Sequence, residues 1–175
     1  ERDSGGWELL RMTPISSLRL VVGKLMSVAW TLMLVLMATL PGYVMMVLIA
    51  PELTLQVQQV LVCLLWTSVY ALAISAAVGC LFKSTAVSTS ITYVVVIAVF
   101  LFPLLVWLGR DAPFGFGTVQ TALLTTPVGA ALSVIEAPGF ESYELLPLSW
   151  WIAGILSSLM FLVLGVQVWR LSRAV

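Results

Sequence analysis

The sequence has no histidine and no asparagine, and only 9% of its residues are charged. The lack of histidine removes the commonest metal ligand and the commonest proton shuttle. The lack of asparagine excludes N-glycosylation within this chain. Eight basic and eight acidic residues cancel, so no excess of positive charge favours nucleic acid as a partner.

Hydrophobic residues make up 61% of the chain and charged residues only 9%, whereas about a quarter of the residues of a soluble domain are charged. A water-facing surface of this composition would be one continuous apolar patch. The composition therefore predicts a protein that uses the bilayer as solvent. The two cysteines, Cys63 and Cys80, stand in one apolar run, about 25 Å apart on a straight helix. That is too far for a disulfide, so both are interpreted as small buried hydrophobes.

Four runs are long and apolar enough to cross a bilayer, which takes about 20 residues. We place the spans at residues 19–50, 57–82, 85–108 and 148–171. The third span is expected to begin inside the Ser/Thr-rich stretch 84–90. The first contains Pro41-Gly42, which predicts a kink or a break near its outer third. The expected fold is an all-α integral membrane protein with one domain.

Basic residues fix the expected topology. With four spans, seven of the eight lie on one side and only Arg110 lies on the other; the seven are Arg2, Arg11, Arg19, Lys24, Lys83, Arg170 and Arg173. The positive-inside rule makes the first side cytoplasmic, together with both visible ends. Residues 109–147 are then external, and the short stretch 119–135 is expected to be a surface or re-entrant helix pair. The expected interface anchors are Trp107, Trp150, Trp151 and Trp169.

Small residues form a stripe on the second span. Ser68, Ala71, Ser75 and Gly79 are spaced three and four apart, so they share one helix face. Ala73 and Ala77 form a second small pair on the same helix. Small residues at this spacing allow close approach of helix backbones. The stripe is read as packing within one subunit or as an interface between two subunits.

Polar side chains within the spans are neutral, and the charged groups lie near the span ends. They are interpreted as interhelical hydrogen-bonding groups or as the lining of a lipid-like substrate path; they are Thr31, Thr39, Thr67, Ser68, Tyr70, Ser75, Ser157, Ser158 and Gln167. Catalysis or ion coupling inside a membrane would need buried ionisable groups. Gly23-Lys24 lacks the upstream glycine of a phosphate-binding loop. We therefore expect no enzyme activity, no metal and no cofactor on this chain.

The segment Glu1 to Lys24 carries the most informative pattern. Ser4-Gly5-Gly6 predicts a turn, and Trp7 to Met12 a short helix that ends at Thr13-Pro14. Its apolar side holds Trp7, Leu9 and Leu10, while Glu8 and Arg11 share the polar side. The physical prediction for residues 1–18 is an amphipathic helix lying on the cytoplasmic surface.

This pattern resembles the permeases of type 2 ABC exporters. That family reads roughly acidic-x-acidic-x-G-T-x-E-x-L-x-x-T-P-x-S, followed by a basic residue and G-K. The chain matches at Glu1, Asp3, Gly5, Glu8, Leu10, Thr13, Pro14, Ser16, Gly23 and Lys24. It departs at Gly6, where threonine is usual. Leu81 to Ala86, Leu124 to Pro127 and the basic end at Arg170 to Arg173 also resemble parts of that family.

The resemblance implies a six-span permease of which this chain holds the last four spans, with two more expected upstream. Residues 1–18 would be the coupling helix that docks on a separate ATPase subunit, which would hold the ATP and Mg²⁺. The implied coupling residues are Glu1, Asp3, Gly5, Trp7, Glu8, Leu9, Leu10, Arg11, Thr13 and Pro14. A second permease subunit and membrane lipid would be the other partners, and the bacterial inner membrane the location. The alternatives are a membrane scaffold that binds a cytoplasmic partner and a small ion-coupled carrier.

Overall fold

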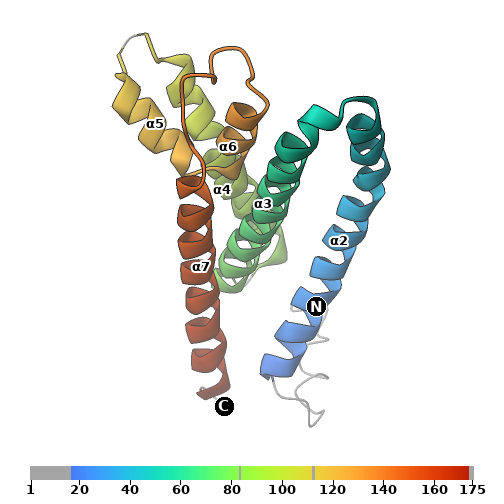
Figure 1. Ribbon diagram of the computed structural model, residues 1–175. Helices are drawn as coiled ribbons and strands as arrows, with labels where there is room; N and C mark the ends of the chain where they lie inside the picture. The colour runs from blue at the N-terminus through green and yellow to red at the C-terminus, as the bar shows by residue number, and fades with distance from the viewer. Residues whose placement is uncertain (1–16, 83, 112, 174–175) are drawn as a thin grey trace.

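The computed structural model describes residues 17–82, 84–111 and 113–173 (Figure 1). In this part of the chain all regular structure is helical. The elements are α2 (Ser17–Ile49), η1 (Pro51–Leu53), α3 (Thr54–Leu81), α4 (Thr85–Leu108), α5 (Phe116–Leu124), α6 (Pro127–Val134) and α7 (Leu148–Arg173). The predicted coupling residues, from Glu1 to Pro14, lie outside the described residues.

Four of the described helices are long and apolar enough to cross a membrane. The qualifying stretches are Val21–Ile49, Pro51–Leu81, Ala86–Leu108 and Leu148–Arg170, each of 23 residues or more. A bilayer needs about 20, so the chain has the make-up of a multi-pass membrane protein. The four-span prediction is confirmed, and α4 does begin in the Ser/Thr-rich stretch, at Thr85.

A kink or a break was predicted at Pro41, and the break is excluded because α2 continues through this residue to Ile49. Helix α4 likewise continues past Pro103 to Leu108. A proline removes one hydrogen bond from the helix ladder. Membrane helices tolerate that loss where neighbouring groups or small backbone adjustments satisfy the freed carbonyl.

Helix α3 is the centre of the bundle. It packs most extensively against α7 and also contacts α2, α4 and α6. Its buried residues are Val57, Cys63, Tyr70, Ala73, Ile74 and Ala77. Helix α2 pairs with α3 through the turn at η1, and its spanning part buries no side chain fully. Figure 1 shows the start of α2 and the end of α7 at the same end of the bundle.

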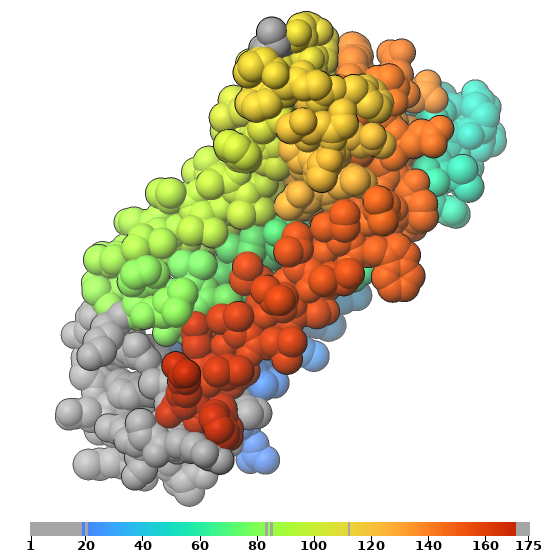
Figure 2. Space-filling view, turned by 90° about the vertical axis from the view of Figure 1, so that its left-hand side faces the viewer, coloured from blue at the N-terminus to red at the C-terminus, as the bar shows by residue number. Residues whose placement is uncertain are grey.

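The opposite end carries the two short helices α5 and α6, which overlap the stretch 119–135 where a surface or re-entrant helix pair was predicted. Helix α5 begins three residues earlier than that stretch, at Phe116. We call residues 113–147, which include both helices, the outer cap. Figure 2 shows the cap gathered at one end of an elongated molecule, with α4 and α7 extending from it.

Candidate functional site

The two ends of the bundle carry opposite kinds of charge. Arg19 and Lys24 stand in the first turns of α2, and Arg170 stands in the last turn of α7, all at one end. The five carboxylates of the described residues lie at the other end, at Glu52, Asp111, Glu136, Glu141 and Glu144. The only basic residue beside them in the described part is Arg110. The positive-inside rule predicts that the basic end, with the start of α2 and the end of α7, is the cytoplasmic one.

The outer cap packs around a closely fitted core. Val119, Leu123 and Ala130 are fully buried there, together with Leu145 from the segment that follows α6. Phe116 stacks on Tyr143 with ring centroids 4.7 Å apart. The cap is therefore a packed body with its own hydrophobic cluster, which also includes Cys63 of α3 and Val106 of α4.

Trp107 attaches this cap to the end of α4. Its ring stacks on Phe140 at 4.3 Å, and its Nε1 donates a hydrogen bond to the carbonyl of Gly139 at 3.1 Å. The Arg110 guanidinium lies 4.4 Å from the centre of the Trp107 ring, in a cation–π contact. Trp107 was predicted as an interface anchor; the structure also gives it a structural role in the cap.

Trp150 has a similar tertiary contact at the start of α7. Its Nε1 donates a hydrogen bond to Sγ of the buried Cys63 at 3.3 Å, which connects α7 to α3. Neither cysteine forms a disulfide, and Cys63 is fully buried as predicted, whereas Cys80 is only partly buried. Trp151 and Trp169 are more than half exposed, as an interface anchor requires.

The hydroxyl groups within the spans were interpreted as interhelical hydrogen-bonding groups or as the lining of a substrate path, and five of them donate hydrogen bonds within their own helices. Each donates to a backbone carbonyl three or four residues earlier in its own helix. These groups are Thr31, Thr39, Thr67, Ser68 and Ser158. Ser157 and Gln167 differ, because buried side-chain oxygens of both have no hydrogen-bond partner.

An apolar groove of about 450 Å³ lies between α3, α4 and the end of α5. Its lining residues are Tyr70, Ala98, Val99, Phe102, Pro103, Ala122 and Thr125. Since Pro103 has no N–H, the carbonyl of Val99 lacks its usual partner in the helix ladder. The groove has the volume of a typical small-molecule site, and Tyr70 and Thr125 are the polar side chains that line it.

The predicted stripe Ser68, Ala71, Ser75 and Gly79 is not the buried face of α3. Its first three residues are half-buried and Gly79 is exposed, whereas Ala73 and Ala77 are buried. The Gly79 carbonyl accepts a hydrogen bond of 3.5 Å from the Ser88 hydroxyl of α4. The second small pair is therefore more deeply buried within this chain than the stripe.

This difference predicts opposite results for two leucine substitutions on α3. Ala73→Leu should destabilise the fold by about 1–3 kcal/mol, because it overpacks a site with no free surface. Gly79→Leu should leave the fold intact, since a Cβ there meets only the Ser88 hydroxyl, at 3.9 Å. Thermal unfolding of the monomer in detergent measures both, and an equal loss in the two variants would contradict this packing.

Among residues 17–82, 84–111 and 113–173, no three His, Cys, Asp or Glu side chains lie close enough to hold a metal ion. The chain was also compared with known proteins. No family model, no curated protein and no solved structure matches it.

Proposed function

We propose that this chain is the permease subunit of an ATP-driven exporter of the type 2 ABC class. It would work with a separate ATPase subunit and a second permease subunit in a bacterial inner membrane. The ATPase chemistry, with its ATP and Mg²⁺, belongs to the partner. This chain supplies the path for the cargo and the contact that couples the path to ATP.

One observation carries the proposal: the exporter-like sequence pattern leads into α2 at the basic end of the bundle. Helix α2 begins at Ser17, directly after Thr13-Pro14 and Ser16 of the pattern, and contains its last two residues, Gly23 and Lys24. Arg19, Lys24 and Arg170 stand at that same end. The positive-inside rule assigns it to the cytoplasm, where an ATPase subunit would be found.

The outer cap gives the proposal a second support. Thr125, at the end of α5, lines one groove with Tyr70 and Val99. Val99 lies about 13 Å below the outer end of α4 at 1.5 Å per residue. The corner between α5 and α6 thus shares a groove with the outer half of α4, which supports a re-entrant pair that gates an exit. The apolar groove beside it suits a hydrophobic or lipid-linked cargo.

The mechanism follows from a bundle with two alternative packings. Closure of the ATPase pair would move the coupling segment as a lever, with Trp7, Leu9 and Leu10 as packing contacts. Glu8 and Arg11 would supply the polar contacts. Helix α2, which directly follows the segment, would carry the movement into the membrane.

The proposal predicts that Glu8→Lys separates the permease from its ATPase. The full-length protein is purified from its native host, and the copurifying proteins are identified and assayed for ATP hydrolysis. The wild type should bring a stoichiometric subunit with a phosphate-binding loop. Glu8→Lys should lower its recovery at least about tenfold, the effect of about 1.4 kcal/mol, because the charge reversal removes one contact and adds a repulsion.

Glu141→Lys is the matched control, since it makes the same charge reversal at an exposed site in the outer cap. It should leave the ATPase bound. A wild-type partner that hydrolyses no ATP would favour the scaffold alternative. The carrier alternative is disfavoured by the described spans, whose charged residues, Lys24, Glu52 and Arg170, all lie within four residues of a span end.

A further inference from the structure

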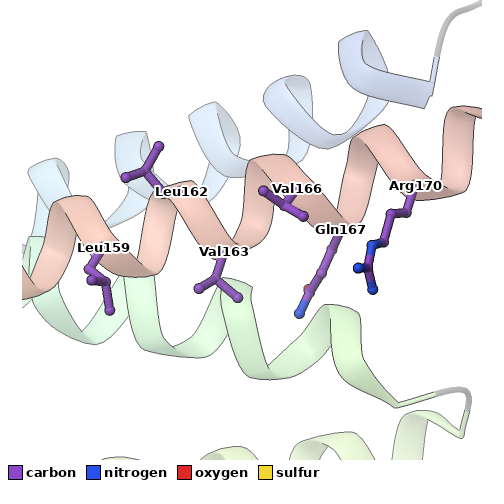
Figure 3. Close-up of a pocket in the computed structure, with 6 residues that line it drawn as sticks. All are labelled: Leu159, Leu162, Val163, Val166, Gln167 and Arg170. Carbon is purple, nitrogen blue, oxygen red and sulfur yellow. The ribbon is translucent and has the colours of Figure 1, made fainter.

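A groove of about 400 Å³ follows one face of α7 toward the cytoplasmic end of the bundle (Figure 3). Four aliphatic residues line its first part, and two polar residues line its end. They are Leu159, Leu162, Val163, Val166, Gln167 and Arg170. Their spacing of three and four places them on one helix face. The four aliphatic residues form the apolar part of the groove, which we call the lane, and Gln167 and Arg170 form its polar end.

This lane is distinct from the face by which α7 packs on the bundle. The buried residues of α7 between Ser157 and Arg170 are Ser157, Leu164 and Val168. The four aliphatic residues of the lane are 38–69% exposed. From Leu159 to Arg170 the helix rises about 16 Å, roughly half of the 30 Å hydrocarbon thickness. The lane therefore has the length of one leaflet.

The polar end of the groove presents hydrogen-bond donors and a positive charge. Figure 3 shows Gln167 and Arg170 extending to the same side of α7, with nitrogen atoms at their tips. The Gln167 Oε1 atom is buried without a hydrogen-bond partner. All carboxylates of the described residues lie at the opposite end of the bundle, so none of them neutralises Arg170. An arginine at this depth reaches the headgroup level with its guanidinium.

We propose that this groove binds an anionic phospholipid with a glycerol headgroup, held from the cytoplasmic leaflet. One acyl chain lies along the lane from Leu159 to Val166. The phosphate accepts hydrogen bonds from the Arg170 guanidinium and the Gln167 amide nitrogen, as basic sites on the cytoplasmic side of membrane proteins do. Rotation of the Gln167 amide toward the groove would let its otherwise unpartnered Oε1 accept a hydrogen bond from a headgroup hydroxyl.

Charge and hydrogen bonding select this lipid over a choline lipid. A choline headgroup places a second cation beside Arg170 and has no hydroxyl to donate. The site requires only that α7 crosses the bilayer with Arg170 at the cytoplasmic side. It therefore stands independently of the exporter function proposed above.

The test measures lipid retained by the purified full-length protein. The protein is placed in nanodiscs of equal phosphatidylglycerol and phosphatidylcholine, released into mild detergent and weighed by native mass spectrometry. Wild type should keep phosphatidylglycerol in preference. Arg170→Gln should lower its retention about fivefold, the effect of one basic residue at a membrane surface. Lys24→Gln removes a charge at the same end but outside the groove, and should retain the lipid.

A second variant tests the lane without changing charge. Val163→Trp fills the lane and should also lower retention of phosphatidylglycerol. Equal retention of the two lipids by wild type, or full retention by Arg170→Gln, would overturn the site. So would a Val163→Trp variant that splits a dimer into monomers while its bound lipid stays unchanged, because a second copy of the chain would then cover the groove.

Discussion

Replacing Gly139 with valine is expected to destabilise the outer cap by about 2–4 kcal/mol. Gly139 has φ +85°, a conformation that costs a side-chain-bearing residue about 1–3 kcal/mol. A Cβ there would also lie 2.9 Å from the Trp107 ring and 3.1 Å from the Arg110 guanidinium. The ring would have to shift, which disturbs its stacking on Phe140 and its hydrogen bond to the Gly139 carbonyl.

Thermal unfolding in detergent should show this as a fall of about 5–10 °C in Tm, on the scale of 2–4 °C per kcal/mol for a chain of this size. Gly117→Ala is the matched control, because Gly117 lies inside α5 with nothing within 4 Å of its added Cβ. Alanine in a helix should stabilise by about 0.5–1 kcal/mol. A Gly139→Val protein as stable as wild type would mean that the cap is not packed as described.

The second large effect is expected at Leu123, in the core of the cap. Its side chain is fully buried and lies against Gly129, whose added Cβ would meet the Leu123 Cδ2 at 3.2 Å. Leu123→Ala removes this filling between α5 and α6. We expect a loss of about 2–5 kcal/mol, the range for leucine truncation in a packed core.

Leu101→Ala is the control that distinguishes the loss of core packing from the loss of a hydrophobic side chain as such. Leu101 is 51% exposed on α4, and lipid tails are as apolar as the leucine side chain. Truncation there should change stability by less than about 0.5 kcal/mol. Limited proteolysis within residues 135–147 gives a second measurement, since the Leu123 variant should be cut faster. Equal Tm values for Leu101→Ala and Leu123→Ala would contradict a packed cap.

The spans could be predicted from sequence because long apolar runs report directly on the solvent around them. The start of α4 at Thr85 and the burial of Cys63 were predicted from local pattern alone. Of the kink or break predicted at Pro41, the break does not occur, since the helix-breaking effect of proline is weaker where a bilayer forbids an open backbone. The residues expected to couple to an ATPase, such as Glu8 and Pro14, remain a prediction from their pattern.

The contacts that hold the outer cap could not be predicted, because they join residues far apart in sequence. Trp107 meets Gly139 across 32 positions, and Trp150 meets Cys63 across 87. A tryptophan beside an external segment is typical of an interface anchor, and nothing in one sequence names its partner. Gly139 stands in a Pro-Gly pair that signals a turn, which was the available hint of its positive φ.

The back-bonded hydroxyls have a mechanical consequence. Each of these hydroxyls donates to a carbonyl of its own helix, as at Thr67, Ser68 and Ser158. Sliding or tilting of α3 against α7 therefore breaks none of these hydrogen bonds. The resistance at those points is only van der Waals contact, which can be remade in a new register. The contacts of Trp107 and Trp150 lie toward the outer end and act as a pivot there. We therefore expect tilting of α3 against α7 to displace the helix ends far from the outer cap more than the ends beside it.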